Sequence, residues 1–134
     1  MPYTHSEARM VSYAINGAIL EVRGEGEYGT GEITAVLIAA KNDPRRPSPT
    51  FLLVDIRESE SNPSIGDVQA RLAVVQQQLG ATMAPVVAFV VRGLARDRLA
   101  QIYQARAQDV GNPFRIEVFT DPEAARAWLK EQGA

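Results

Sequence analysis

The sequence predicts an α/β domain built as a βαβ sandwich, with a mostly parallel five-stranded sheet, an antiparallel N-terminal strand and about four helices. Residues 50–56 (TFLLVDI) and 85–91 (PVVAFVV) are continuous apolar runs rich in β-branched residues, which is typical of strands buried on both faces of a parallel sheet. Apolar residues at helical spacing follow the first run, and an alternating stretch precedes it. Strands that alternate with helices indicate right-handed crossovers and helices on both faces of the sheet.

The chain is expected to open with an antiparallel hairpin. Apolar residues alternate over residues 11–15 and again over residues 18–22, on either side of Asn16-Gly17. Asn-Gly between alternating runs is the strongest short hairpin signal, because both residues tolerate positive φ. The sequence therefore places the turn at Asn16-Gly17.

Helices are predicted after the hairpin and around the second apolar run. Apolar residues recur at spacings of three and four over residues 30–42 and again over residues 65–79, and Gly80 follows the second segment as a stop. A third helix is expected over residues 94–109, with Gly111 after it. These segments supply the crossovers between the predicted parallel strands.

The C-terminus is expected to form a strand and a helix. Residues 114–119 (FRIEVF) predict the strand. Asp121-Pro122-Glu123 predicts the start of the helix, because it combines an N-cap residue, a proline in the first turn and an early acid. The buried face of this helix is expected to consist of Ala124, Ala125, Trp128 and Leu129.

The composition indicates one globular domain. The 134 residues include 46% hydrophobic and 22% charged residues, which is typical of a soluble domain of ordinary size. Residues 10–132 are predicted to form this domain, after a flexible N-terminus over residues 1–9. The N-terminus lacks a signal-peptide pattern, and no apolar run approaches the roughly 18 residues of a membrane span. The sequence therefore predicts a cytoplasmic protein without a membrane span.

Charge and residue content argue against several functions. The net charge of −2 lacks the basic footprint of a nucleic-acid partner. The chain has no cysteine, hence no thiolate nucleophile and no cysteine metal site. The only histidine, His5, falls in the predicted flexible terminus, so a catalytic triad is not expected. Asp55, Glu58 and Glu60 lack the spacing of a calcium loop. We therefore expect no catalytic residues, no metal site and no enzymatic activity.

Three glycines have the Gly-x-Gly-x-x-Gly spacing of a dinucleotide-binding loop. Gly24, Gly26 and Gly29 follow a predicted strand and precede a predicted helix, as that loop requires. Asp55 ends the next predicted strand, where a ribose-binding acid would lie. Open α/β sheets bind ligands at the carboxyl ends of their strands. These four residues are therefore a candidate site for a small ligand, either a nucleotide or an apolar molecule.

Three acids argue against a bound pyrophosphate. Glu25 and Glu27 lie within the glycine segment, and Glu32 lies at the start of the predicted helix. Their carboxylates would offset the attraction of a helix N-terminus for phosphate. We therefore expect no cofactor, and we interpret the glycines as the turn from strand to helix. Asp55 is then expected to cap its strand end or to accept a hydrogen bond from the following loop.

Ser64 directly precedes the second predicted helix. Ser64-Ile65-Gly66-Asp67 resembles a capping box, in which the serine is the N-cap. A serine beside a polar, acidic loop is also a candidate phosphosite, because phosphate would add nearly two negative charges to that surface. Ser61 lies in the same loop. Ser61, Ser64 and Asp67 are thus candidates for phosphorylation or for binding a partner.

Over residues 10–130 the chain resembles the STAS domains, specifically the SpoIIAA-like group. The resemblance lies in the opening hairpin, in FLLVDI with the acidic loop and helix after it, in PVVAFVV and in the ending FRIEVFTDPEAARAWL. It implies a small α/β domain that acts through protein contacts in bacterial signalling. Better-known members carry Asp-Ser-Ser-Gly, with a phosphorylated serine, at the second helix. Here Pro63-Ser64-Ile65-Gly66 stands in that place and lacks the Asp and the second Ser.

Two functional hypotheses follow. The first is a non-enzymatic regulatory or interaction domain of the anti-sigma-factor-antagonist type, with residues 57–71 and the second helix as its partner surface. Its partner would be a kinase-type or other signalling regulator, and a homodimer stays open. The alternative is a domain that binds a small ligand, a nucleotide or an apolar molecule, near Gly24, Gly26, Gly29 and Asp55.

Overall fold

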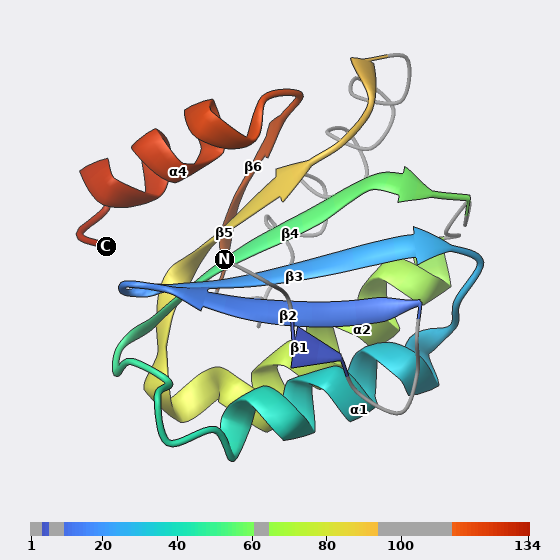
Figure 1. The fold of residues 1–134 in the computed structure, drawn as a ribbon, viewed down its shortest axis with the longest axis horizontal. Coiled ribbons are helices and arrows are strands. Elements are labelled where there is room, and N and C mark those ends of the chain that lie inside the picture. Colours follow the sequence, from blue (N-terminus) through green and yellow to red (C-terminus); the bar gives the residue numbers. More distant parts are fainter. Residues whose placement is uncertain (1–3, 6–9, 61–64, 94–113) are drawn as a thin grey trace.

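The computed structural model describes residues 4–5, 10–60, 65–93 and 114–134, which contribute to a six-stranded sheet with helices on both faces (Figure 1). The strand order in the sheet follows the chain, from β1 to β6. Pairing is antiparallel from β1 to β3 and parallel from β3 to β6. The strands are β1 (Thr4–His5), β2 (Val11–Asn16), β3 (Ile19–Gly26), β4 (Thr50–Ser59), β5 (Met83–Val90) and β6 (Arg115–Phe119).

The helices lie on the two faces of the sheet. They are α1 (Thr30–Lys41), α2 (Ile65–Leu79), the short 3₁₀ turn η1 (Gly80–Thr82) and α4 (Pro122–Glu131). Right-handed crossovers between parallel strands in sequential order place their helices on one face. Figure 1 shows α1 and α2 together on one side of the sheet and α4 on the other. The predicted helix over residues 94–109 lies outside the described residues.

The two apolar runs form neighbouring strands, as predicted. In the parallel ladder between β4 and β5, Leu52 is opposite Val87 and Val54 is opposite Phe89. β4 also pairs with β3, and β5 also pairs with β6. Both strands are therefore interior, which explains why their sequences are apolar on both faces.

The predicted hairpin is confirmed, but its turn lies one residue further along the chain. Asn16 pairs with Ile19, so the loop residues are Gly17 and Ala18. Gly17 has a φ of 60°, as a turn with glycine at its first central position requires. This register pairs Ile15 with the large side chain of Leu20, whereas the predicted turn would have paired Ile15 with Ala18.

A short strand begins the described chain within the segment expected to be flexible. Thr4 pairs with Tyr13 and His5 pairs with Ser12, antiparallel to β2. The backbone of this pair thus adds a sixth strand to the predicted five. None of the described helices is long and apolar enough to cross a membrane.

The sheet separates two apolar clusters. The cluster beneath α1 and α2 includes Leu20, Leu37, Leu52, Val75, Leu79 and Val87. The cluster beneath α4 includes Phe51, Leu53, Val86, Val90, Ala125 and Leu129. Neighbouring residues of one strand alternate between the two clusters because strand side chains point to opposite faces.

The C-terminal helix begins as predicted, and one residue of its expected buried face is exposed. The Glu123 N–H donates to Asp121 Oδ1 at 3.1 Å, so Asp121 is the N-cap. Ala125 and Leu129 are fully buried, and Trp128 packs against the same cluster. Ala124 is exposed to solvent, because it lies one helical step outside the stripe defined by Ala125 and Leu129.

Candidate functional site

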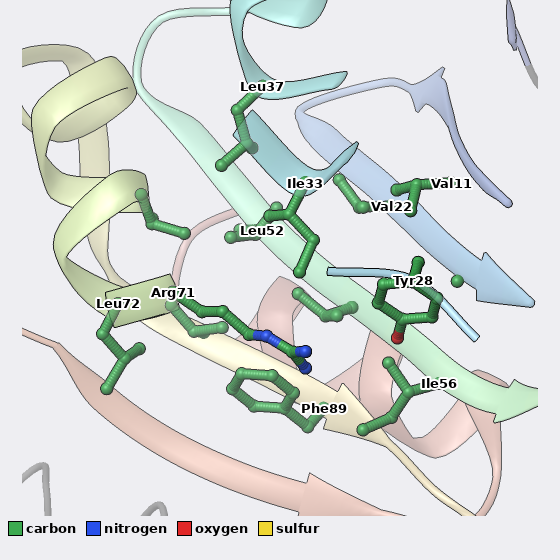
Figure 2. A pocket seen from close by; sticks show the side chains of 14 residues that line it. Val11, Val22, Tyr28, Ile33, Leu37, Leu52, Ile56, Arg71, Leu72 and Phe89 are labelled. Carbon is green, nitrogen blue, oxygen red and sulfur yellow. The ribbon is translucent and has the colours of Figure 1, made fainter. Parts of the chain in front are cut away.

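A cavity lies between the sheet and the helix pair α1 and α2 (Figure 2). Its volume is about 50 Å³, and one water molecule needs roughly 10–15 Å³. The lining surface is almost wholly apolar, which suits an apolar ligand. Its floor is formed by strand residues, among them Val11, Val22, Leu52, Val54, Val87 and Phe89.

Short side chains on the strands contribute to this space. Val22 and Val54 are direct neighbours on β3 and β4, and both line the cavity. Valine is short, so these positions leave room beneath Ile33 of α1 and Leu72 of α2, which form part of the opposite wall. Both helix residues are only partly buried. The cavity therefore reaches the surface on the side where these residues lie.

Tyr28 covers one side of the cavity. It lies in the turn between β3 and α1, and its ring packs directly on Gly24. A Cβ atom at Gly24 would overlap the Tyr28 hydroxyl oxygen, which no real structure tolerates without movement. Gly24 is therefore the residue that lets the tyrosine ring lie against β3 at the cavity wall.

Arg71 is the charged residue of the cavity lining, and it reaches in from α2. Its Cζ atom lies 5.5 Å from the centroid of the Tyr28 ring, within the range of a cation–π contact. Figure 2 shows the guanidinium group extending from α2 toward Tyr28 and Phe89. The cavity thus has an apolar body and one cationic group at its edge.

The Arg71 Nε atom is buried and has no hydrogen-bond partner among the described residues. A buried donor without a partner costs about 1–3 kcal/mol, so such an atom calls for an explanation. Several other arginines of the described chain donate to polar groups of the protein. Examples are Arg45 to Asp43, Arg57 to Asp55, Arg92 to Glu58, Arg115 to Gln132 and Arg126 to Glu21.

Gly26 and Gly29 form part of the turn between β3 and α1. Gly26 ends β3 with a φ of 66°, a conformation that favours glycine. Gly29 is the N-cap of α1, and its N–H donates to Glu32 Oε2 at 2.6 Å. This hydrogen bond lowers the pKa of Glu32. The Gly29 amide is thus already bonded to Glu32 and is not available to a phosphate. Of the three glycines, only Gly24 lines the cavity.

Asp55 lies on the other face of the sheet from the cavity. Its neighbours Val54 and Ile56 line the cavity, so the Asp55 side chain points away from it. β4 continues to Ser59, and Asp55 therefore lies within the strand rather than at its end. Its carboxylate accepts bonds from Arg57, at 2.7 Å from Nη2 and 3.0 Å from Nε. The structure does not bring Asp55 and Gly24 into one site.

Asp55 is expected to make stability depend on acid pH. Burial raises the pKa of Asp55, but the hydrogen bonds from Arg57 outweigh it, so the net pKa is lowered. The stabilisation is present above the pKa of an unfolded Asp, about 3.9, and is lost as pH falls through the lower folded value. Between pH 6 and pH 3, the free energy of unfolding in urea should therefore fall less for Asp55→Asn than for the wild type. Equal losses in both proteins would contradict the assignment.

The serine candidates lie outside the described residues. Ser61 and Ser64 belong to the undescribed segment 61–64, and α2 begins at the next residue, Ile65. Asp67 lies in α2, but its side chain is not among those described. Their roles in phosphorylation or partner binding stay predictions.

Sequence reasoning missed the two residues at the edge of the cavity. Arg71 follows Val68 by three residues and precedes Val75 by four, so helical periodicity places it beside the apolar stripe of α2. The position of Arg71 could therefore have been predicted from the sequence. Tyr28 had no comparable signal, because its position depends on the path of the turn after Gly24.

The fold has a counterpart among solved structures. A crystal structure of an uncharacterised DUF3478-family protein with a SpoIIAA-like fold, from Shewanella loihica PV-4, superposes with a TM-score of 0.59 and 17% sequence identity. The match covers 89% of this chain and 91% of the other. No protein-family model and no curated protein matches the sequence. The chain therefore has a SpoIIAA-like α/β fold, in agreement with the resemblance found in its sequence.

Proposed function

We propose that the chain is a non-enzymatic domain that binds a small apolar molecule between its sheet and the helices α1 and α2. The observation that carries the proposal is the apolar cavity of about 50 Å³. Ligand sites are typically concave and mostly apolar, with a small number of polar groups that set orientation. The cavity has this character, with Arg71 as its charged group.

Packing physics supports a ligand in this space. Protein interiors are packed like organic crystals, and voids larger than a water molecule are few. The side chains that line a void lose dispersion contacts on that side. A ligand that fills the cavity restores these contacts. It stabilises the folded state by about 2.7 kcal/mol when present at 100 times its Kd.

Filling the cavity by mutation tests the proposal. Val54→Phe would place a ring in the cavity, and cavity filling of this kind typically adds about 0.5–2 kcal/mol of stability. A panel of small alcohols, carboxylates and aromatic compounds should raise the Tm of the wild type by several degrees. The same compounds should leave the Tm of Val54→Phe unchanged. Equal shifts in both proteins, or no shift in the wild type, would count against a ligand in this cavity.

A regulatory role through a protein partner is the second candidate. The predicted partner surface, residues 57–71 and α2, includes Arg71 at the cavity edge. A partner bound there would therefore be sensitive to the occupant of the cavity. Incubation with candidate kinases followed by mass spectrometry tests the phosphosite part of this idea. Phosphate on Ser64 or Ser61 would support it, and the absence of modification at both would oppose it.

A further inference from the structure

We propose that the ligand of the cavity is an amphiphilic monocarboxylate, whose apolar part fills the cavity and whose carboxylate binds Arg71. The inference rests on the proposed function, because it names the chemistry of the molecule bound at the same site. Three features of the site carry it: the position of Arg71, the state of its donors and the charge of its surroundings.

The position of Arg71 suits a ligand that is apolar along most of its length and charged at one end. Leu37, Leu52 and Val87, deep in the cavity, are each at most 1% exposed. Arg71 is partly exposed and stands at the edge of the same space. A molecule inserted with its apolar part among the leucines would therefore bring its polar end to the guanidinium group.

The donors of Arg71 suit a carboxylate. The Nε atom is buried and without a hydrogen-bond partner among the described residues. The ring of Tyr28 lies 5.5 Å from Cζ, and a cation–π contact uses the face of the guanidinium group rather than its N–H edges. The Nε atom itself is covered, so a planar carboxylate at the edge of the cavity would accept two parallel hydrogen bonds from the terminal Nη groups.

The surroundings favour one negative charge over two. Arg71 is the only cation among the residues that line the described cavity. The acids Glu25 and Glu27 precede Tyr28 in the turn, and both are exposed. The Gly29 amide is already bonded to Glu32. A phosphate group normally takes more donors than one arginine supplies, from helix N-terminal amides or further cations, so the carboxylate is the better match.

Ligands of equal length and different head groups test this inference. The probes are the straight-chain carboxylates from butanoate to dodecanoate, each with the corresponding alcohol and amine, titrated calorimetrically at pH 7.5. The wild type should bind the best-fitting carboxylate at least about tenfold more tightly than its alcohol, as a charge-assisted hydrogen bond implies. The amine should bind more weakly than the alcohol.

Arg71→Gln should lose this preference and bind carboxylate and alcohol about equally. Arg71→Lys should recover part of the preference, because it keeps the charge without the planar fork. Arg115→Gln is the matched control, because Arg115 also lies over an aromatic ring, 5.7 Å from the centroid of Trp128. That ring packs in the cluster on the other face of the sheet, so this variant should bind like the wild type.

The outcomes separate the two levels of the proposal. Equal binding of carboxylates and alcohols by the wild type, or a carboxylate preference that survives Arg71→Gln, would overturn the inference and leave the apolar site in place. If no carboxylate, alcohol or amine binds at all, both the inference and the proposed function are wrong.

Discussion

Leu52→Ala is expected to lower the free energy of unfolding by about 3–5 kcal/mol, as fully buried leucines do when truncated. Leu52 is 1% exposed and lies in interior strand β4, next to Leu20 of β3 and Val87 of β5. It also lines the cavity. Truncation should therefore enlarge the cavity, and the variant should prefer longer ligands than the wild type does. Urea unfolding and the same homologous series of carboxylates measure both effects.

The adjacent residue supplies the control. Leu53 is equally buried in the same strand, but its side chain belongs to the cluster beneath α4. Leu53→Ala should therefore cost a similar free energy of unfolding and leave the preferred ligand length unchanged. If the two variants changed ligand preference in the same way, the cavity beneath α1 and α2 would not be the binding site.

Arg126→Met is expected to lower the free energy of unfolding by about 2–4 kcal/mol, since removing one partner of a buried ion pair leaves the other poorly compensated. Arg126 of α4 binds both carboxylate oxygens of Glu21 on β3, each at 2.8 Å. The Glu21 side chain is 5% exposed and that of Arg126 is 25% exposed. Hydrogen bonding to Glu21 raises the pKa of Arg126, so the guanidinium group stays charged. Chemical unfolding at pH 7 measures the loss.

A double variant distinguishes loss of the pair from loss of packing. Glu21→Leu combined with Arg126→Met replaces both charges by apolar side chains, which is often close to neutral for a buried pair. The double variant should therefore be more stable than Arg126→Met alone. Glu123, which also contacts Arg126, is exposed, and Glu123→Ala should change stability by less than about 0.5 kcal/mol. If the losses in the free energy of unfolding caused by Glu21→Leu and by Arg126→Met simply added in the double variant, the two residues would not be a coupled pair.

The sequence was sufficient for most of the architecture because periodicity reports burial directly. The apolar runs at β4 and β5 had no polar face, so they could only be interior strands. The stripe of α1 and the cap of α4 were likewise local signals. The hairpin turn was misplaced by one residue because two registers put the same side chains on the same face, and cross-strand packing of Ile15 with Leu20 decided between them.

The candidate site was less predictable because a cavity is a property of packing between distant segments. The spacing of Gly24 to the other glycines predicts a nucleotide-type loop, whereas in the structure Gly24 makes room for the ring of Tyr28. The sequence places Asp55 at a strand end, but β4 continues to Ser59, and the Asp55 carboxylate binds Arg57 on the face of the sheet opposite the cavity. Neither the length of β4 nor the empty space beside Val54 can be derived from residue types alone.

The most direct test of the account is to locate a bound ligand by nuclear magnetic resonance. Isotope-edited spectra of the methyl-labelled protein with the best-fitting carboxylate of the series should show contacts from the ligand chain to the methyl groups of Leu37, Leu52 and Val87. No contact should reach Leu53 or Leu129 on the other face of the sheet. Contacts to those two residues in place of the first three, or no contacts at a saturating concentration of that carboxylate, would contradict a ligand site between the sheet and α1 and α2.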